Sequence, residues 1–323
     1  MKIRYILLAP VAVLFCTASA SATQISHTWV SGSGNDNNTC SFASPCATFQ
    51  GALANTSSGG IITAKDAGDF GKVSISKSVT IDGANLGSIT YDNGNGIYIA
   101  ASVNVTVQNL TINGLDLASY GIDVTSGGIV IIDHCRIMNI TYDGIIFAGA
   151  GNLTVENSRI ESLSGSNVTG IYIGSNAAEN VVVRNTVIDA SPVLAENYGI
   201  FIASGTGPLE VSLQKVTVMG AGNAAVFTYS GTTEVTGSVI TQSSDGVVAA
   251  SGAMISVASS MITANTIGVC SGTSSKIRLD NNDIYDNTTA IDNCGGIVKT
   301  SGTNKISGTI TIPAADISES MTF

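Results

Sequence analysis

The sequence predicts an all-β, single-domain fold: a right-handed parallel β-helix (solenoid) with a short N-terminal capping helix. The first observation is an internal repeat whose units start at Gly96, Gly121, Gly144 and Gly170, so that these units are 25, 23 and 26 residues long. The second is that apolar residues alternate with polar ones inside each unit. The third is that Gly, Asn and Ser separate the alternating runs. Repeats of this length are typical of solenoids, in which each unit forms one turn.

Each repeat unit contains three short apolar runs, which predict three strands per turn. In one unit the runs are Ile171 and Ile173, then Val181 and Val183, then Ile188. Alternation with a period of two predicts strands, and the repeats contain no helical period. One turn would bury about six aliphatic side chains at roughly 1.5–3 kcal/mol each. Ordering its backbone costs roughly 1–2 kcal/mol per residue. We therefore expect stability to come from the stacking of turns.

The two ends of a parallel array need covers, because the outermost strands would otherwise leave unpaired backbone groups. A short helical pattern in residues 48–60, ended by two glycines, predicts the N-terminal cap. We therefore divide the chain into a signal peptide (1–22), the cap with the first coils (23–95), the repeat coils (96–308) and a C-terminal cap (309–323). No low-complexity linker suggests a second domain.

The first residues have the pattern of a cleaved secretory signal. Lys2 and Arg4 precede an apolar run over residues 5–16, and small residues follow up to Ala20 and Ala22. The apolar run is too short to remain as a membrane anchor. We expect cleavage after Ala20 or Ala22 and an exported product, secreted or periplasmic, with no membrane anchor.

Charge and composition exclude several functions. The 323 residues include 13 basic and 23 acidic residues, for a net charge of -10. Nucleic-acid binding requires a basic surface, so it is not expected. The chain has only two histidines, His27 and His134, so a His-rich metal site is excluded, and we predict neither a metal nor a cofactor.

Five cysteines follow the predicted signal peptide, and the export signal places them in an oxidising compartment. Cys40 and Cys46 flank a short loop that contains a proline, and we predict a disulfide between them. Cys270 and Cys294 are expected on neighbouring coils, two strand positions out of register. Ideal geometry would put their Cα atoms about 8 Å apart, beyond disulfide reach, unless the chain bends after Cys294. The sequence therefore leaves open whether Cys270 and Cys294 form a disulfide or remain separate thiols.

The order of motifs resembles that of a known family. WVSGSGND from Trp29, C…PCATF, FGKVSISKSVTIDGA and the Gly-initiated coils are similar to secreted bacterial right-handed β-helix proteins of the pectate-lyase-like superfamily. The resemblance covers nearly the whole mature chain and implies the fold, but this fold hosts lyases, hydrolases, esterases and binding proteins. Four motifs typical of polygalacturonases are absent. The stretch IDHC resembles one found in pectate lyases, but Ile131 stands where that family has Trp.

Asp133, His134 and Cys135 stand side by side and raise the question of a reactive cluster. Aligning the repeats places His134 in the same position as Asn109 and Asn157, a corner position that favours Asn. Cys135 falls on the first inward position after the corner, where a thiol acts as a small hydrophobic group. We therefore predict a structural role for all three.

A candidate ligand site lies on what we call the first-strand face, the outward side of the first strand of each unit. Its predicted outward column is Tyr98, Asp123, Ile146, Tyr172, Phe201, Phe227, Val248, Cys270 and Asp292. Aromatic rings on three consecutive coils suit the C–H faces of sugars. The substrate-binding residues that we predict are Tyr98, Asp123, Tyr172, Phe201, Phe227 and Tyr229. The alternative to a sugar-binding face is an aromatic ladder that is covered by the longer loops preceding Gly170 and Gly199.

The predicted partner is a polysaccharide or cell-surface glycan, neutral or weakly charged, which the protein binds and which it could slowly hydrolyse. Hydrolysis needs two carboxylates roughly 5–9.5 Å apart, and the weak candidates are Asp123 and Asp143. Glu196 and Asp245 are also expected near this face. One alternative is a structural or adhesive surface protein that contacts other proteins. A polysaccharide lyase is less favoured, because the outward column contains no basic residue. Whether the chain is an enzyme remains open.

Overall fold

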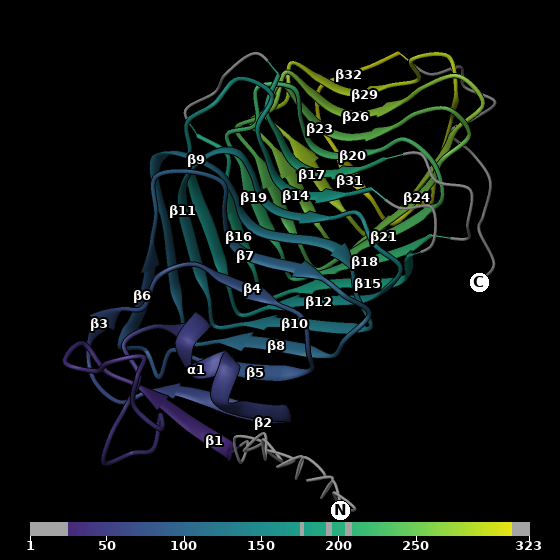
Figure 1. Ribbon diagram of the computed structural model, residues 1–323. Helices are drawn as coiled ribbons and strands as arrows, with labels where there is room; N and C mark the ends of the chain where they lie inside the picture. Colours follow the sequence, from purple (N-terminus) through teal and green to yellow (C-terminus); the bar gives the residue numbers. More distant parts are fainter. Residues whose placement is uncertain (1–24, 175–177, 192–195, 204–208, 312–323) are drawn as a thin grey trace, which may run out of the picture.

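The computed structural model describes residues 25–174, 178–191, 196–203 and 209–311, and in these segments the chain winds into a parallel β-solenoid (Figure 1). The strands stack in three ladders that run along the length of the molecule, and each paired strand is parallel to its partner. The predicted all-β parallel β-helix with one short N-terminal helix is confirmed. The predicted signal peptide lies outside the described residues.

The first ladder is a sheet of 12 strands, which we call sheet 1. Its strands, in spatial order, are β1 (Ile25–Val30), β2 (Thr56–Ala64), β5 (Val79–Asp82), β8 (Val105–Gln108), β10 (Ile129–Asp133), β12 (Gly151–Glu156), β15 (Ala178–Arg184), β18 (Glu210–Gln214), β21 (Thr232–Thr236), β24 (Met254–Ala258), β27 (Lys276–Asp280) and β30 (Ile297–Thr300).

Two long strands, β9 (Thr111–Ser126) and β11 (Arg136–Phe147), bend around a corner and take part in both remaining ladders. Sheet 2 also contains β3 (Gly68–Asp69), β6 (Gly87–Thr90), β13 (Arg159–Leu163), β16 (Val187–Asp189), β19 (Thr217–Met219), β22 (Val239–Thr241), β25 (Met261–Thr263), β28 (Asp283–Tyr285) and β31 (Lys305–Ile306). Sheet 3, the first-strand face, also contains β4 (Val73–Ile75), β7 (Asn95–Ala100), β14 (Thr169–Ile173), β17 (Tyr198–Ile202), β20 (Ala224–Thr228), β23 (Asp245–Ala249), β26 (Ile267–Ser271), β29 (Thr289–Asp292) and β32 (Thr309–Ile310).

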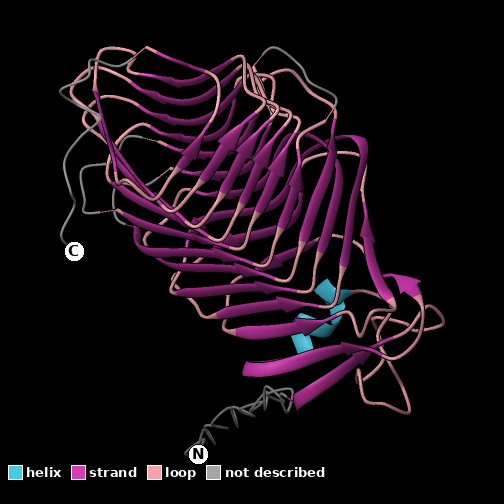
Figure 2. Ribbon diagram, turned by 180° about the vertical axis from the view of Figure 1, so that it is seen from behind, coloured by secondary structure: helices cyan, strands magenta, loops and turns pink. Residues whose placement is uncertain are grey.

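The core is a continuous column of Ile, Val and Leu side chains enclosed by the three sheets. Figure 2 shows the backbone of these sheets from behind. The glycine that starts each repeat permits close stacking of the coils. A Cβ on Gly144 would lie 2.6 Å from Ile160 Cγ2 and 2.7 Å from the carbonyl oxygen of Gly170. Both this glycine and the following Ile145 are buried. The residues on either side of this pair, Asp143 and Ile146, can therefore both face outward.

The N-terminal helix is shorter than the predicted pattern. Helix α1 spans Phe49–Asn55 and starts at Thr48, whose hydroxyl accepts a hydrogen bond from the backbone N–H of Gly51. It buries Phe49, Ala52 and Leu53 against the first coils. The prediction that the helical pattern continues to two glycines near residue 60 is wrong. Thr56 is extended, and its hydroxyl donates to the Ala52 carbonyl, so the chain enters β2 instead.

The corner after eight sheet 1 strands, from β8 to β27, has a left-handed backbone, as the repeat alignment predicted. His134 has a φ of 50°, and its partners in the column have φ between 49° and 58°, namely Asn109, Asn157, Asn185, Lys215, Gly237, Ser259 and Asn281. The amide of Asn157 donates to Asp133 Oδ1, and His134 Nδ1 lies 2.7 Å from that same oxygen. The structural interpretation of His134 is consistent with this geometry.

Cys135 lies inside the core, one residue beyond the corner. Its side chain is buried, and it forms no disulfide. Burial raises the pKa of the thiol to about 12, so the group stays protonated at neutral pH. A protonated, buried thiol is neither a nucleophile nor a metal ligand.

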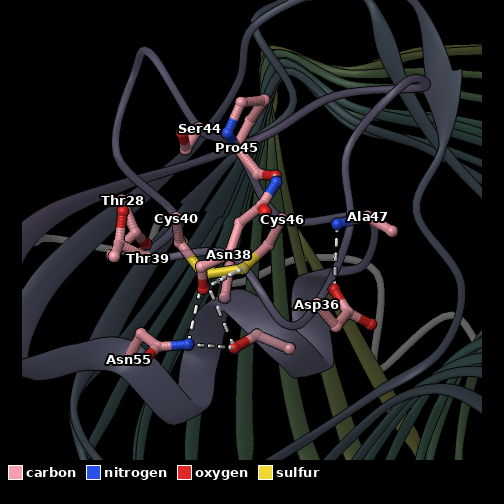
Figure 3. The surroundings of a disulfide bond; sticks show 12 residues. Thr28, Asp36, Asn38, Thr39, Cys40, Ser44, Pro45, Cys46, Ala47 and Asn55 are labelled. Carbon is pink, nitrogen blue, oxygen red and sulfur yellow. Dashed lines mark hydrogen bonds between the residues drawn. A yellow bond between two sulfur atoms is a disulfide. The ribbon is translucent and has the colours of Figure 1, made fainter. Parts of the chain in front are cut away.

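The predicted disulfide between Cys40 and Cys46 is present, with Cα atoms 4.6 Å apart. Figure 3 shows it beside α1, where Asn55 Nδ2 donates to Cys40 Sγ at 3.2 Å. Cys270 and Cys294 also form a disulfide, with Cα atoms 5.6 Å apart. The bend that the sequence required lies at Cys294 and Gly295, which both have positive φ. Two disulfides indicate an extracytoplasmic protein.

At the C-terminal end, β32 pairs with β29 and closes the described ladder. The rest of the predicted C-terminal cap, residues 312–323, lies outside the described residues. Within the described segments, α1 is the only helix, and with 7 residues it is too short to cross a membrane.

Candidate functional site

The outward column of the first-strand face has the register that the sequence predicted. Asp123 pairs with Tyr98 on one side and with Ile146 on the other. Tyr172 pairs with Ile146 and Phe201, and the column continues through Phe227, Val248, Cys270 and Asp292. Adjacent coils are about 4.8 Å apart, so the stretch from Tyr98 to Phe227 is about 24 Å long.

The three consecutive rings form a stacked ladder. The ring centroids of Tyr172 and Phe201 are 5.5 Å apart at 6°, and those of Phe201 and Phe227 are 5.1 Å apart at 2°. Parallel rings at these separations are offset, and each covers part of its neighbour. Tyr198 packs edge-on against Phe201 and Phe227. The rings are half-buried, so they present less free surface than the sequence suggested.

The C-terminal part of the column is covered. Val248 and Cys270, expected to face outward, are buried at 7% and 9% exposure. They form a small apolar cluster with Ala224, against which Phe227 and Tyr198 pack. These two positions therefore offer little surface to a ligand, whereas the rings of Tyr98, Tyr172 and Phe201 are half-buried.

Sequence analysis missed a second column on the same face. Two consecutive residues of each first strand point inward. The residue three positions before each member of the predicted column therefore also faces outward. The members of this second column, in register, are Asn95, Tyr120, Asp143, Thr169, Tyr198, Ala224, Asp245, Ile267, Thr289 and Thr309. These residues could have been found in the sequence, because they precede a Gly-Ile or Gly-Val pair in seven coils and an Ala-Val or Ala-Ile pair in two. The assumption of strict inward-outward alternation assigned them to the wrong side.

A pocket of about 220 Å³ lies where the two columns meet. It is lined by Asp143, Asn167, Thr169, Tyr172, Glu196, Tyr198 and Phe201. Pockets that enclose a whole small ligand measure about 300–1,000 Å³, so this one is sized for part of a longer molecule. It combines two carboxylates with three aromatic walls.

Asp143 has unusual electrostatics in this pocket. Burial raises the pKa of its carboxyl to about 7, although the Thr169 side chain and backbone oppose this by hydrogen bonding. The Thr169 N–H donates to Asp143 Oδ1 at 3.1 Å. The negative charge of Asp123 raises the pKa further. A carboxyl with a pKa near neutrality can donate or accept a proton at physiological pH.

Asp123 is buried rather than exposed, at 8%. Its Oδ2 accepts a hydrogen bond from Asn95 Nδ2 at 2.7 Å, and burial raises the pKa of the carboxyl. Its Oδ1 is buried and has no hydrogen-bond partner in the described part of the chain. Asp123 and Asp143 lie on adjacent coils but are not paired with each other. Asp143 is paired with Tyr120, and Asp123 is paired with Ile146. The two acids are therefore diagonal neighbours.

The two remaining predicted residues lie at the edges. Tyr98 lines a second pocket of about 340 Å³ at the N-terminal end of the face, together with Gln50, Lys72, Val73, Ser74, Gly94 and Asn95. Tyr229 is 42% exposed just beyond the end of β20. Among the described residues, no group of three or more His, Cys, Asp or Glu side chains is placed to hold a metal ion.

Comparisons with known proteins agree with this architecture. The Azotobacter vinelandii mannuronan C-5 epimerase AlgE4 A-module is similar over 78% of this chain and 80% of its own, with 15% identity and a TM-score of 0.59. The pectate lyase Pel9A is similar over 90% of this chain and 78% of its own, with 15% identity and a TM-score of 0.55. At these identities the likeness shows the fold alone.

Sequence comparisons give a family but no close relative. No curated protein matches the chain. The family model described as "Right handed beta helix region" matches residues 60–213 and 198–312, which span the three ladders from β2 to β32. With these coils stacked in register on all three faces, the chain belongs to the right-handed β-helix family.

Proposed function

We propose that the protein is an exported polysaccharide-binding protein that holds a neutral or weakly charged glycan along the first-strand face, between Tyr98 and Phe201. The observation that carries the proposal is the pocket at Asp143, where carboxylates and aromatic rings line the same hollow on the first-strand face. Sugar rings combine apolar C–H faces with hydroxyl groups, and such a site offers partners for both.

The fold supports a carbohydrate role. Two solved structures with a similar architecture are polysaccharide enzymes, an epimerase that acts on mannuronan and a pectate lyase. Mannuronan and pectate are polyanions. The two outward columns of this face hold several acids and no Lys or Arg, so a polyanion would be repelled here. This contrast favours a glycan without a high negative charge.

The two disulfides and the N-terminal signal pattern support an exported location, secreted or periplasmic. A glycan of the cell surface or of the medium would be accessible in either place.

Binding is tested with a double variant, Tyr172→Ala with Phe201→Ala, on a panel of immobilised glycans. We expect the variant to lose retention on the glycan that the wild type binds, because two of the aromatic pocket walls are removed. Tyr285→Ala is the control: this tyrosine is exposed on sheet 2, away from the proposed site. Full retention of the double variant would overturn the sugar-face assignment, and binding of a protein partner instead would favour an adhesive role.

Slow hydrolysis, with Asp123 and Asp143 as the carboxylate pair, remains a prediction. The raised pKa of Asp143 suits a general acid. Incubation with the same glycan panel, scored for new reducing ends and for unsaturated ends, separates hydrolysis from elimination. Release of reducing ends that is absent from Asp143→Asn would support hydrolysis. Absence of any product would leave binding as the function.

A further inference from the structure

Three acidic side chains lie at or next to the pocket, and among the described residues none of the pocket's lining side chains is basic. Asp143 and Glu196 line it, and Asp123 lies one coil before Asp143. Asp123 Oδ1 is a buried acceptor with no hydrogen-bond donor within the described segments. Burying a carboxylate is costly unless it is paired, so this arrangement leaves a positive charge to be supplied from outside.

The part of the chain that the structure describes supplies no such charge among the residues that line the pocket. None of the seven lining residues is basic, and neither outward column contains Lys or Arg. The pKa of Asp143 is raised to about 7, first by burial and also by Asp123. A cation beside Asp143 would reverse both effects, because an opposite charge favours the ionised carboxylate.

The aromatic walls favour an organic cation. Tyr172, Tyr198 and Phe201 line the same pocket as the acids, and aromatic rings attract ammonium groups through cation–π interactions. A metal ion needs several oxygen ligands together. No group of three potential acidic, His or Cys ligands occurs in the described ranges, so an ammonium group fits this pocket better than a divalent metal.

We propose that the pocket at Asp143 binds the protonated amine of an amino sugar, so that the preferred glycan carries free 2-amino-2-deoxy residues. This inference rests on the proposed function, and it names the substrate class of the same site. The ammonium donates to Asp143 and Glu196, and the sugar ring lies against Tyr172. An N-acetylated residue has no such charge, and a uronate is repelled.

The titratable groups that face Asp143 come from every neighbouring element. They are Tyr120 and Asp123 of β9, Tyr172 of β14, Tyr198 of β17 and Glu196 just before β17. None of these side chains can carry a positive charge, so none competes with a ligand cation for the carboxylate.

The test is calorimetric binding at pH 6.5 with three β-1,4-linked or α-1,4-linked hexasaccharides: glucosamine, N-acetylglucosamine and galacturonate. We expect the wild type to bind the glucosamine hexamer about tenfold or more tightly than the N-acetylated one, since hydrogen bonds to charged groups contribute about 1.5–3 kcal/mol. Asp143→Asn and Glu196→Gln should both reduce this ratio toward one. Glu196 is exposed, so its variant tests the idea even if Asp143→Asn unfolds.

Asp245→Asn is the matched control. Asp245 lies in the same column, four coils beyond Asp143, and burial also raises its pKa, but it does not line the pocket. Its variant should keep the full preference for the amine. If Asp143→Asn and Glu196→Gln also keep it, the preference comes from the general acidity of the protein and the inference is overturned. Equal affinity for amine and N-acetyl hexamers, or preference for galacturonate, overturns it as well. Failure to bind any glycan in this and the wider panel would instead contradict the proposed function.

Discussion

Asn95 donates a hydrogen bond to Asp123 across one coil step, with 2.7 Å between Nδ2 and Oδ2, while Asp123 Oδ1 is buried and meets no donor from the described segments. Asn95 belongs to the column that alternation concealed, and Asp123 to the column that the repeat alignment predicted. Their contact joins the two columns next to the proposed site. It also gives Asp123 its one side-chain hydrogen bond among the described residues.

Replacing Asn95 should therefore destabilise the protein. Asn95→Ala leaves the buried carboxyl of Asp123 without its donor, and we expect a loss of about 1–3 kcal/mol in the free energy of unfolding at neutral pH. Denaturant unfolding measures it. Asn37→Ala, at an exposed position, is the control and should change stability by less than about 0.5 kcal/mol. An equal effect of the two substitutions would contradict the importance of this bond.

The raised pKa of Asp143 predicts a pH-dependent stability. The folded pKa is about 7 and the ordinary value is 3.8, so between these limits the folded state binds more protons than the unfolded state. The contribution of Asp143 to the free energy of unfolding is fully present below about pH 4 and is lost as the pH rises through 7. Asp143→Asn removes the titration and should stabilise the protein at pH 8 by roughly 2 kcal/mol.

The measurement is urea unfolding of wild type and Asp143→Asn from pH 4 to pH 8, with the difference between them plotted against pH. Asp116→Asn serves as the control, since Asp116 is exposed and its left-handed backbone (φ 58°) tolerates Asn. A constant difference between wild type and Asp143→Asn over this range would show that Asp143 does not carry the effect.

Close stacking of coils at the repeat glycines predicts a severe effect at Gly144. Gly144→Ala places a methyl group 2.6 Å from Ile160 Cγ2 and 2.7 Å from a carbonyl oxygen. We expect a loss of about 1–3 kcal/mol, because an overpacked core has to shift. Gly302→Ala is matched in chemistry but has open space around the added methyl. Thermal unfolding should leave the Gly302 variant near wild type, and a similar loss in both would exclude stacking as the cause.

The corner assignment predicts that His134 is replaceable. His134→Asn keeps a residue suited to φ of 50° and restores the asparagine of neighbouring coils, so stability should change by less than about 0.5 kcal/mol. His134→Val places a β-branched residue in the left-handed region and should destabilise by about 1–2 kcal/mol. Glycan binding should be unaffected by His134→Asn, and its loss would reopen a functional role for this histidine.

The two disulfides should differ in their contribution to stability. Cys270 and Cys294 close a loop with a separation of 24 residues, and Cys40 and Cys46 one of 6. The chain-entropy model gives about 3 kcal/mol for the longer loop and about 2 kcal/mol for the shorter one. Paired Cys→Ser variants compared by denaturant unfolding test this order. A reversed order would indicate that local packing, such as the contacts around Cys40 at α1, outweighs loop entropy.

The sequence by itself determined the fold, the register of the coils and the corners. Gly121, Gly144 and Gly170 mark the same position in successive turns, and side-chain alternation with period two assigns each neighbour to the inside or the outside. These features are local and periodic, so they can be identified from the sequence without a structure. The pairing of Tyr172 with Phe201 followed directly from them.

Only the tertiary structure decided what each outward position meets. Alternation treated Asp123, Val248 and Cys270 as exposed, but all three are buried. Val248 and Cys270 are packed against Ala224, Tyr198 and Ile267 of the second outward column. Alternation gave no sign that Asp143, Glu196 and Tyr198 line one pocket, because a pocket depends on how coils of unequal length bring separate loops together. The closure of Cys270 onto Cys294 likewise depended on a local bend, which the average geometry of a strand does not contain.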